Sequence, residues 1–204
     1  MIKINAYNLL YDFRDFLKEN IGKFTIIALI NIAAIALGIR SGFAVYDAES
    51  YLITHQTNEF LLITAERGIF AYFFINLITY LILFSLLALL SAHFLLSYLC
   101  FAILFFQTYY FAMYLSLYIA MLKLSVLPFI LCCLLPCFLL CTFILAIVAV
   151  MTLNRANDLR CYGCGRSNCF PVYMQRLLLP CITLSITLIL FAIPSYFLTI
   201  GIIL

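Results

Sequence analysis

The stretch that decides the fold is IFAYFFINLITYLILFSLLALLSAHFLLSYLCFAILFFQTYYFAMYLSLYIAML, residues 69–122. It contains no aspartate, glutamate, lysine or arginine, and no glycine or proline. At about 1.5 Å per residue, one helix of this length would be far longer than the ~30 Å hydrocarbon core of a bilayer, so the stretch suits two crossings. Ser91, Ala92 and His93 are the polar cluster near its middle. We therefore predict spans at 69–90 and 94–121, joined by a turn.

The composition of the whole chain indicates that lipid is its solvent. Of 204 residues, 68% are hydrophobic and 9% are charged, whereas soluble domains have about 45–50% and about 25%. A soluble fold of this size has too much surface to hide so many apolar side chains. The net charge of +3 comes without a basic tract and does not suggest nucleic-acid binding. We predict an all-α, polytopic integral membrane protein.

Three further apolar stretches complete a five-span prediction, at 24–45, 125–153 and 177–204. Each is long enough for a crossing, which needs about 20 mainly apolar residues. The polar stretches 46–68 and 154–176 then become an outer loop and a cytoplasmic loop. Within the outer loop, the FLLIT sequence suggests a helix or strand lying against the membrane.

The distribution of basic residues orients this arrangement. Cytoplasmic segments of membrane proteins carry an excess of lysine and arginine. Five spans put eight of the eleven basic residues on the side of the N-terminus and of the 154–176 loop, and three on the other side. We therefore predict a cytoplasmic N-terminus and an external C-terminus, in what we expect to be a bacterial cell membrane. The eight are Lys3, Arg14, Lys18, Lys23, Arg155, Arg160, Arg166 and Arg176.

Residues 1–22 have the pattern of an amphipathic helix. Apolar residues such as Leu9, Phe13 and Phe16 recur at helical spacing, and charged residues such as Asp12 and Lys18 fall on the other face. Such a helix directly before a span can lie flat in the membrane interface. It can equally dock on a partner or on the cytoplasmic loop, and the sequence leaves both open.

The cytoplasmic loop contains the sequence CYGCGRSNC, residues 161–169. A disulfide is disfavoured there, because the cytoplasm is reducing. Cys161 and Cys164 have the spacing of half a zinc knuckle, and Cys169 is a candidate third ligand; a closed site needs a fourth, either Cys181 or a cysteine of a second subunit. The alternatives are a redox pair and a plain solvated turn with free thiols, and the sequence favours the plain turn.

The predicted fourth span has a row of cysteines, Cys133, Cys137 and Cys141, at every fourth residue. Thiols in such a row can form a path for a soft metal ion. They can also pack as small polarizable side chains between helices. Packing is favoured by the sequence, since no methionine-rich or histidine-bearing row accompanies the cysteines.

The polar residues within the predicted spans do not form a catalytic or ion-coupling set. Asn31, Asn76 and Gln107 are expected to hydrogen-bond between helices, and His93 is expected in a turn. No charged residue lies at the centre of a span, which argues against a secondary transporter or pump. The chain also lacks HExxH and GxSxG motifs, so we do not expect an enzyme.

The order of these parts is similar to that of the stage II sporulation protein M family. The resemblance rests on the five-span layout, on the first span ending in GIRSG (38–42), and on SVLP (125–128) with Pro136 further along. It implies a non-catalytic membrane scaffold that holds partners such as peptidoglycan-remodelling proteins. The CYGCGRSNC sequence at 161–169, which we call the cysteine loop, is a departure from the family. The alternative is the permease subunit of a transporter driven by a separate ATPase. The sequence does not decide whether the protein is an oligomer.

Overall fold

The computed structural model describes residues 14–122, 134–162, 173 and 176–191 of the 204-residue chain. Within these ranges, only the backbone is described at 47–73, 118, 121–122 and 161–162. The described part is helical and contains no β-strand. The predicted all-α fold is therefore confirmed for this part. Of the predicted N-terminal helix at 1–22, residues 14–22 are among those described: 14–19 are helical, Asn20 is in a turn, and the next helix begins at Ile21.

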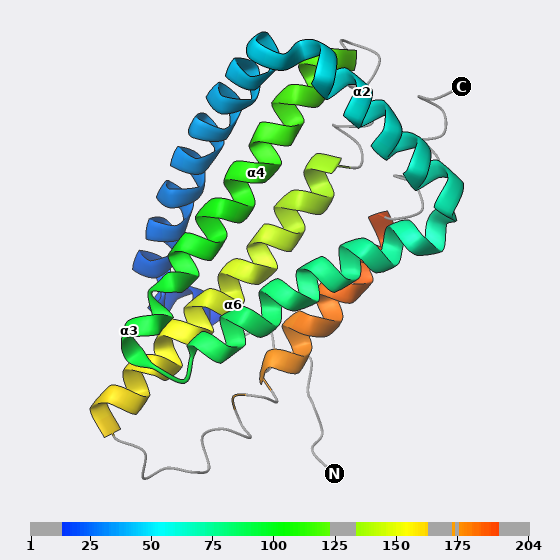
Figure 1. Cartoon of the computed structure of the whole chain (residues 1–204). Helices are drawn as coiled ribbons and strands as arrows, with labels where there is room; N and C mark the ends of the chain where they lie inside the picture. Colours follow the sequence, from blue (N-terminus) through cyan, green and yellow to red (C-terminus); the bar gives the residue numbers. More distant parts are fainter. Residues whose placement is uncertain (1–13, 123–133, 163–172, 174–175, 192–204) are drawn as a thin grey trace.

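The longest element is α2, Ile21–Leu90, which continues for 70 residues without a break in its backbone hydrogen bonding. Its path turns twice, so that the helix has three parts (Figure 1). The first and last parts are apolar, and the middle part runs through residues 46–68, where the sequence predicted an outer loop. The connection between the first two apolar stretches is thus helical. No glycine or proline occurs between Gly42 and Gly68 to end the helix.

The long apolar stretch breaks where its polar cluster lies. Helix α2 ends at Leu90, a turn covers Ser91–His93, and α3, Phe94–Ser97, begins directly afterwards. The Ser91 hydroxyl donates to the carbonyl of Ala88 at 2.6 Å, which satisfies a terminal carbonyl of α2. Helix α4, Leu99–Leu122, then returns along α2. The break falls at the position that the sequence predicted for the hairpin.

Helix α6, Leu135–Tyr162, forms the centre of the described bundle. Within its apolar part 56% of the residues are buried, compared with 17% and 22% in the other two long apolar helices. Leu145, Val148 and Val150 are fully buried. Pro136 is the second residue of α6. The helix continues past Leu153, the predicted end of the fourth span.

Three described helices are long and apolar enough to cross a membrane, namely Ile21–Tyr46, Phe94–Leu117 and Leu135–Arg160. Two shorter apolar helices, Phe74–Leu90 and Arg176–Phe191, coincide with the second and fifth predicted spans. These findings support a membrane protein. Of the fourth and fifth predicted spans, residues 125–133 and 192–204 lie outside the described part.

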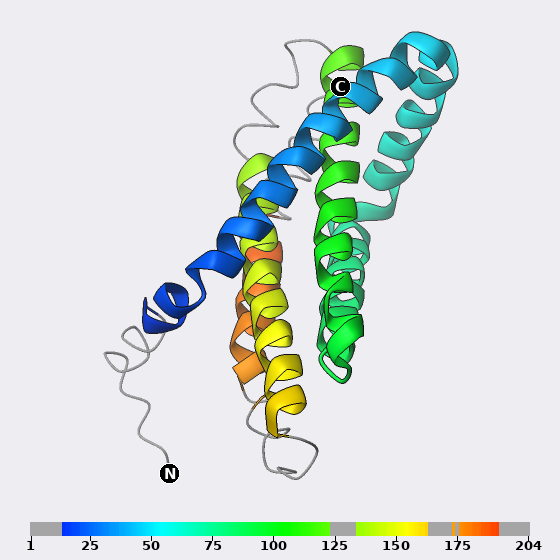
Figure 2. The same ribbon diagram turned by 90° about the vertical axis from the view of Figure 1, so that its left-hand side faces the viewer.

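Successive apolar segments run in alternating directions (Figure 1). The start of α2, helix α3, the end of α6 and the start of Arg176–Phe191 lie at one end of the bundle, which we call the α3 end. The helical middle part of α2 and the end of α4 lie at the opposite end. Figure 2 shows the first part of α2 slanting across α4 and α6. These two helices are the main packing partners of α2 as a whole.

Candidate functional site

Helices α2 and α4 pack closely together where two glycines of α2 face α4. A Cβ added at Gly38 would lie 2.9 Å from the Cβ of Ala112 and 3.1 Å from the backbone nitrogen of Met113. A Cβ added at Gly42 would lie 2.6 Å from the Met113 carbonyl oxygen and would also clash with the Ser116 hydroxyl. The two helices can therefore meet at this distance only because both positions are glycine.

A hydrogen bond between side chains reinforces this contact. The Thr108 hydroxyl on α4 donates to Oδ1 of Asn31 on α2 at 3.0 Å. Asn31 is thus an interhelical hydrogen-bonding residue, as predicted. The buried positions of the first part of α2 and of α4 recur at intervals of four or seven residues, and most are small. They are Ile27, Ala34, Gly38 and Gly42 on α2, and Cys100, Leu104, Thr108, Ala112 and Ser116 on α4.

The two glycines were not among the predicted site residues, although the sequence has a signal for them. Gly38 and Gly42 form a G-x-x-x-G pattern inside an apolar segment, which is typical of close helix–helix packing in membranes. Our sequence interpretation used this stretch only as part of a family resemblance. The structure assigns it to the contact between α2 and α4.

At the α3 end of the bundle, a polar cluster joins the start of α2 to α6. Lys23 Nζ donates to Oδ1 of Asn20 at 3.2 Å and also to Oδ1 of Asn154. Asn154 Nδ2 donates to the same Asn20 oxygen at 3.0 Å. Asn20 Nδ2 in turn donates to the Phe16 carbonyl at 2.9 Å. Because Phe16 belongs to the helical segment before α2, the cluster connects that segment to the end of the central helix.

A second contact at the same end involves Tyr173, which follows the cysteine loop in the sequence. Its side chain is only 7% exposed. Its hydroxyl lies 3.4 Å from that of Thr152, which also donates to the carbonyl of Leu87 at 3.0 Å. The guanidinium carbon of Arg155 lies 4.4 Å from the centre of the Tyr173 ring. Tyr173 is therefore held against α6 through Thr152 and Arg155, close to the end of α2.

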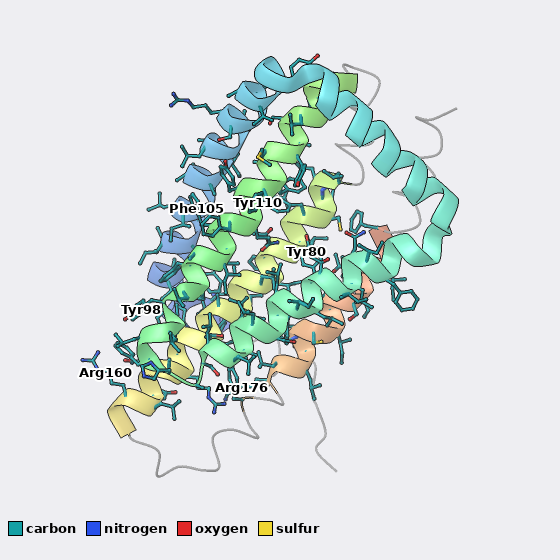
Figure 3. All side chains as sticks on the ribbon, in the orientation of Figure 1. Tyr80, Tyr98, Phe105, Tyr110, Arg160 and Arg176 are labelled. Atoms are coloured by element: carbon teal, nitrogen blue, oxygen red, sulfur yellow. The ribbon has the colours of Figure 1, made fainter. Side chains whose placement is uncertain are left out.

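Basic residues gather at the α3 end. Arg160 lies in the last turn of α6, with its guanidinium carbon 4.6 Å from the centre of the Phe94 ring. Figure 3 shows Arg160 and Arg176 at this end of the bundle. Lys23 and Arg155 are part of the contacts just described. These four basic residues therefore lie at the same end of the bundle.

The proposed metal ligands are largely outside the described part. The backbone of Cys161 is in the last turn of α6, and Cys164 and Cys169 lie outside the described residues. Cys181, a candidate fourth ligand, is a free cysteine that packs against the apolar core. The grouping of these four cysteines therefore lies outside the described residues. Among the described residues, no group of three histidine, cysteine or acidic side chains is arranged to hold a metal ion.

An apolar groove of about 590 Å³ lies between the last part of α2 and α4. Its walls include Leu83, Leu90, Ile103 and Phe106, and Gln107 contributes an amide. The amide nitrogen and oxygen of Gln107 are buried, and neither has a hydrogen-bond partner in the described part. Gln107 lies beside Tyr80 of α2, and the prediction that it hydrogen-bonds between helices stays a prediction.

Comparisons with known proteins identify no relative: no protein-family model, curated protein or solved structure matches this chain.

Proposed function

We propose that this chain is a non-catalytic membrane scaffold that crosses the bilayer five times and holds partner proteins at its surface. The N-terminus and the cysteine loop face the cytoplasm, and the C-terminus faces the outside. The proposal keeps the resemblance to the stage II sporulation protein M family, with peptidoglycan-remodelling proteins as the expected partners.

The observation that carries this proposal is the continuous helix α2. Its polar middle part is a helix rather than an irregular loop, and it joins two apolar parts that belong to the bundle. A helix held at both ends loses little further conformational entropy when a partner binds, which favours its use as a docking element. Glu59 and Glu66 are at positions i and i+7 of this helix, so helical periodicity places both on one side of the backbone.

The packing of the bundle interior is consistent with a supporting role. Leu145, Val148, Ala149 and Val150 on α6 are fully buried, and the α2–α4 contact is as close as glycine permits. The alternating directions of the apolar segments support the five-span topology (Figure 1). The basic residues at the α3 end support a cytoplasmic location for that end.

Co-purification from detergent tests the proposal. The variant Glu59→Lys with Glu66→Lys should lose its partner while the bundle stays folded. The matched control is Glu19→Lys, the same change at an exposed position before α2. The scaffold proposal predicts a cell-wall-remodelling protein among the partners recovered with the unchanged chain and with the control. Equal recovery with all three chains would contradict the assignment of the middle part of α2 as the docking element. Recovery of a nucleotide-binding subunit would instead support the permease alternative.

A further inference from the structure

The apolar groove between the last part of α2 and α4 is open on one side. Four of its wall residues are large apolar or aromatic side chains with exposed fractions between 43% and 53%; they are Leu86, Leu99, Phe106 and Tyr110. In a membrane, side chains of this kind are covered by lipid tails, which are as apolar as leucine, or by another apolar helix. The groove therefore takes an apolar occupant that is not among the described residues.

The length of the groove matches one leaflet of a bilayer. Along α4 its wall runs from Leu99 to Tyr110, which at about 1.5 Å per residue is about 16 Å. One leaflet provides about half of the ~30 Å hydrocarbon core, whereas a transmembrane helix needs the full thickness. An acyl chain of one leaflet therefore fits the groove, and the spanning helix of a partner would extend well beyond it.

One end of the groove lies at the α3 end of the bundle. The wall residues Leu90 and Leu99 stand on either side of the turn and of α3, and Phe94 begins α3. Arg160 of α6 contacts Phe94, with its guanidinium carbon 4.6 Å from the centre of the ring. Figure 3 shows Arg160 at this end of the bundle. A lipid whose acyl chain occupied the groove would thus have its headgroup at the level of Arg160.

The guanidinium of Arg160 is in a position to bind a phosphate. Contact with an aromatic ring engages the face of a guanidinium and leaves the N–H groups at its edge available. These N–H groups form a planar fork that matches two phosphate oxygens. The side chain is exposed, and no carboxylate of the described part forms an ion pair with it. The cation is therefore held in place by Phe94 without being neutralised there.

We propose that an anionic phospholipid binds at this site, with one acyl chain in the groove and its phosphate at Arg160. Basic sites between helices on the cytoplasmic side of membrane proteins bind anionic headgroups. Arg160 favours such a lipid over a zwitterionic one, because the zwitterionic headgroup carries its own positive charge. The site requires a membrane location but not the scaffold role, so either of the two can fail without the other.

The test uses a fluorescent reporter, since the chain contains no tryptophan. Phe106→Trp places a reporter in the groove wall, and Phe43→Trp places one on the first part of α2, at an exposed position outside the groove. Each full-length variant is reconstituted in vesicles of phosphatidylcholine with a minor fraction of phosphatidylglycerol. Bromine at the middle of the acyl chains quenches tryptophan on contact. It is carried either by the phosphatidylglycerol or by an equal amount of the phosphatidylcholine.

Bromine on phosphatidylglycerol should quench the reporter at position 106 more strongly, with a preference of about fivefold, the usual effect of one arginine on an anionic lipid. At position 43 the two lipids should quench alike. Arg160→Gln should remove the preference at position 106. The matched control is Arg14→Gln, the same change at an exposed arginine of the helical segment before α2. This variant should keep the preference, because that segment lies across the bundle from the turn between α2 and α3 (Figure 2).

A further variant acts on the groove rather than on the charge. Ala102→Phe adds a ring to the groove wall and should weaken the preference by filling the space of the acyl chain. Ala33→Phe makes the same change at an exposed position of α2 and should not. Retention of the full preference in Ala102→Phe would overturn the proposal, and so would equal losses in Arg160→Gln and Arg14→Gln. Equal quenching by both lipids at position 106 would overturn it as well. Quenching by neither lipid would show that protein covers the groove, either a second copy or another part of this chain, and would also overturn it.

Discussion

Gly38 on α2 faces Ala112 on α4 so closely that a methyl group added to the glycine would lie 2.9 Å from the methyl group of the alanine. Real Cβ atoms do not approach other heavy atoms at that distance. One helical turn further along, Gly42 makes the same kind of contact with Met113. The first predicted span and the third are therefore packed backbone to backbone, although about 70 residues separate them along the chain.

The first prediction concerns these two glycines. Gly38→Ala and Gly42→Ala should each lower the free energy of unfolding by about 1–3 kcal/mol, the usual cost of inserting a methyl group into a closely packed site. At Gly38 the nearest atom is a backbone oxygen of α4, and at Gly42 the Met113 carbonyl oxygen lies 2.6 Å away beside the Ser116 hydroxyl, so moving a side chain alone does not make room for either methyl group. Thermal unfolding in detergent, followed by circular dichroism, measures the loss.

Gly22 provides the matched control for this pair. It also lies in α2, but a Cβ added there meets no atom within 4 Å. Gly22→Ala should therefore leave stability unchanged or raise it by up to about 1 kcal/mol, because alanine favours the helix. A loss at Gly22 equal to the loss at Gly38 would show that the helix–helix contact is not the cause.

The second prediction concerns the hydrogen bond between α4 and α2. Thr108→Val keeps the shape of the side chain but leaves Asn31 Oδ1 without the Thr108 hydroxyl. The expected loss of stability is about 0.6 kcal/mol and at most about 1.7 kcal/mol, the range found for such bonds in membranes. Thr79→Val is the control, since the exposed Thr79 hydroxyl donates only to its own helix, to the Ile75 carbonyl. Equal effects at the two threonines would contradict the prediction.

The third prediction concerns the polar cluster at the α3 end. Asn154→Leu removes both bonds that this residue makes, to Lys23 and to Asn20. The remaining partners are partly buried, so we expect a loss of about 1.5–3 kcal/mol, as for hydrogen bonds to charged groups. The detachment of the segment before α2 should also make the backbone near Lys18 more open to limited proteolysis.

Asn157 on the same helix is exposed and serves as the control. Asn157→Leu makes the same chemical change one turn away and should leave both stability and proteolysis nearly unchanged. If the two variants behave alike, the polar cluster does not hold the start of α2 against α6.

The fourth prediction concerns the topology. A reporter enzyme that is active only outside the cytoplasm should be inactive when inserted at Gly165 and active when fused after Leu204. The reason is that five crossings put these two positions on opposite sides, with the basic residues on the side of Gly165. Activity at both positions, or at neither, would put Gly165 and Leu204 on the same side of the membrane and would contradict a single crossing between them.

The sequence by itself determined the class of this protein and the places where its helices can end. The run at 69–122 is too long for one crossing, and its polar cluster at Ser91–His93 is where α2 gives way to α3. These features follow from local chemistry, because hydrocarbon thickness limits helix length and a polar cluster favours a turn. The absence of glycine and proline at 46–67 could also have shown that this connection continues as helix.

Only the tertiary structure decided which faces of the helices meet. In a soluble protein, the apolar side of a helix marks its buried face, but α4 is apolar all round, so its sequence shows no such side. The pairing of Gly38 with Ala112 and the bond from Thr108 to Asn31 both join residues far apart in the chain. Such contacts depend on how each helix is rotated against its neighbours. In lipid, close packing and hydrogen bonding set that rotation, because hydrophobicity does not distinguish one side from another.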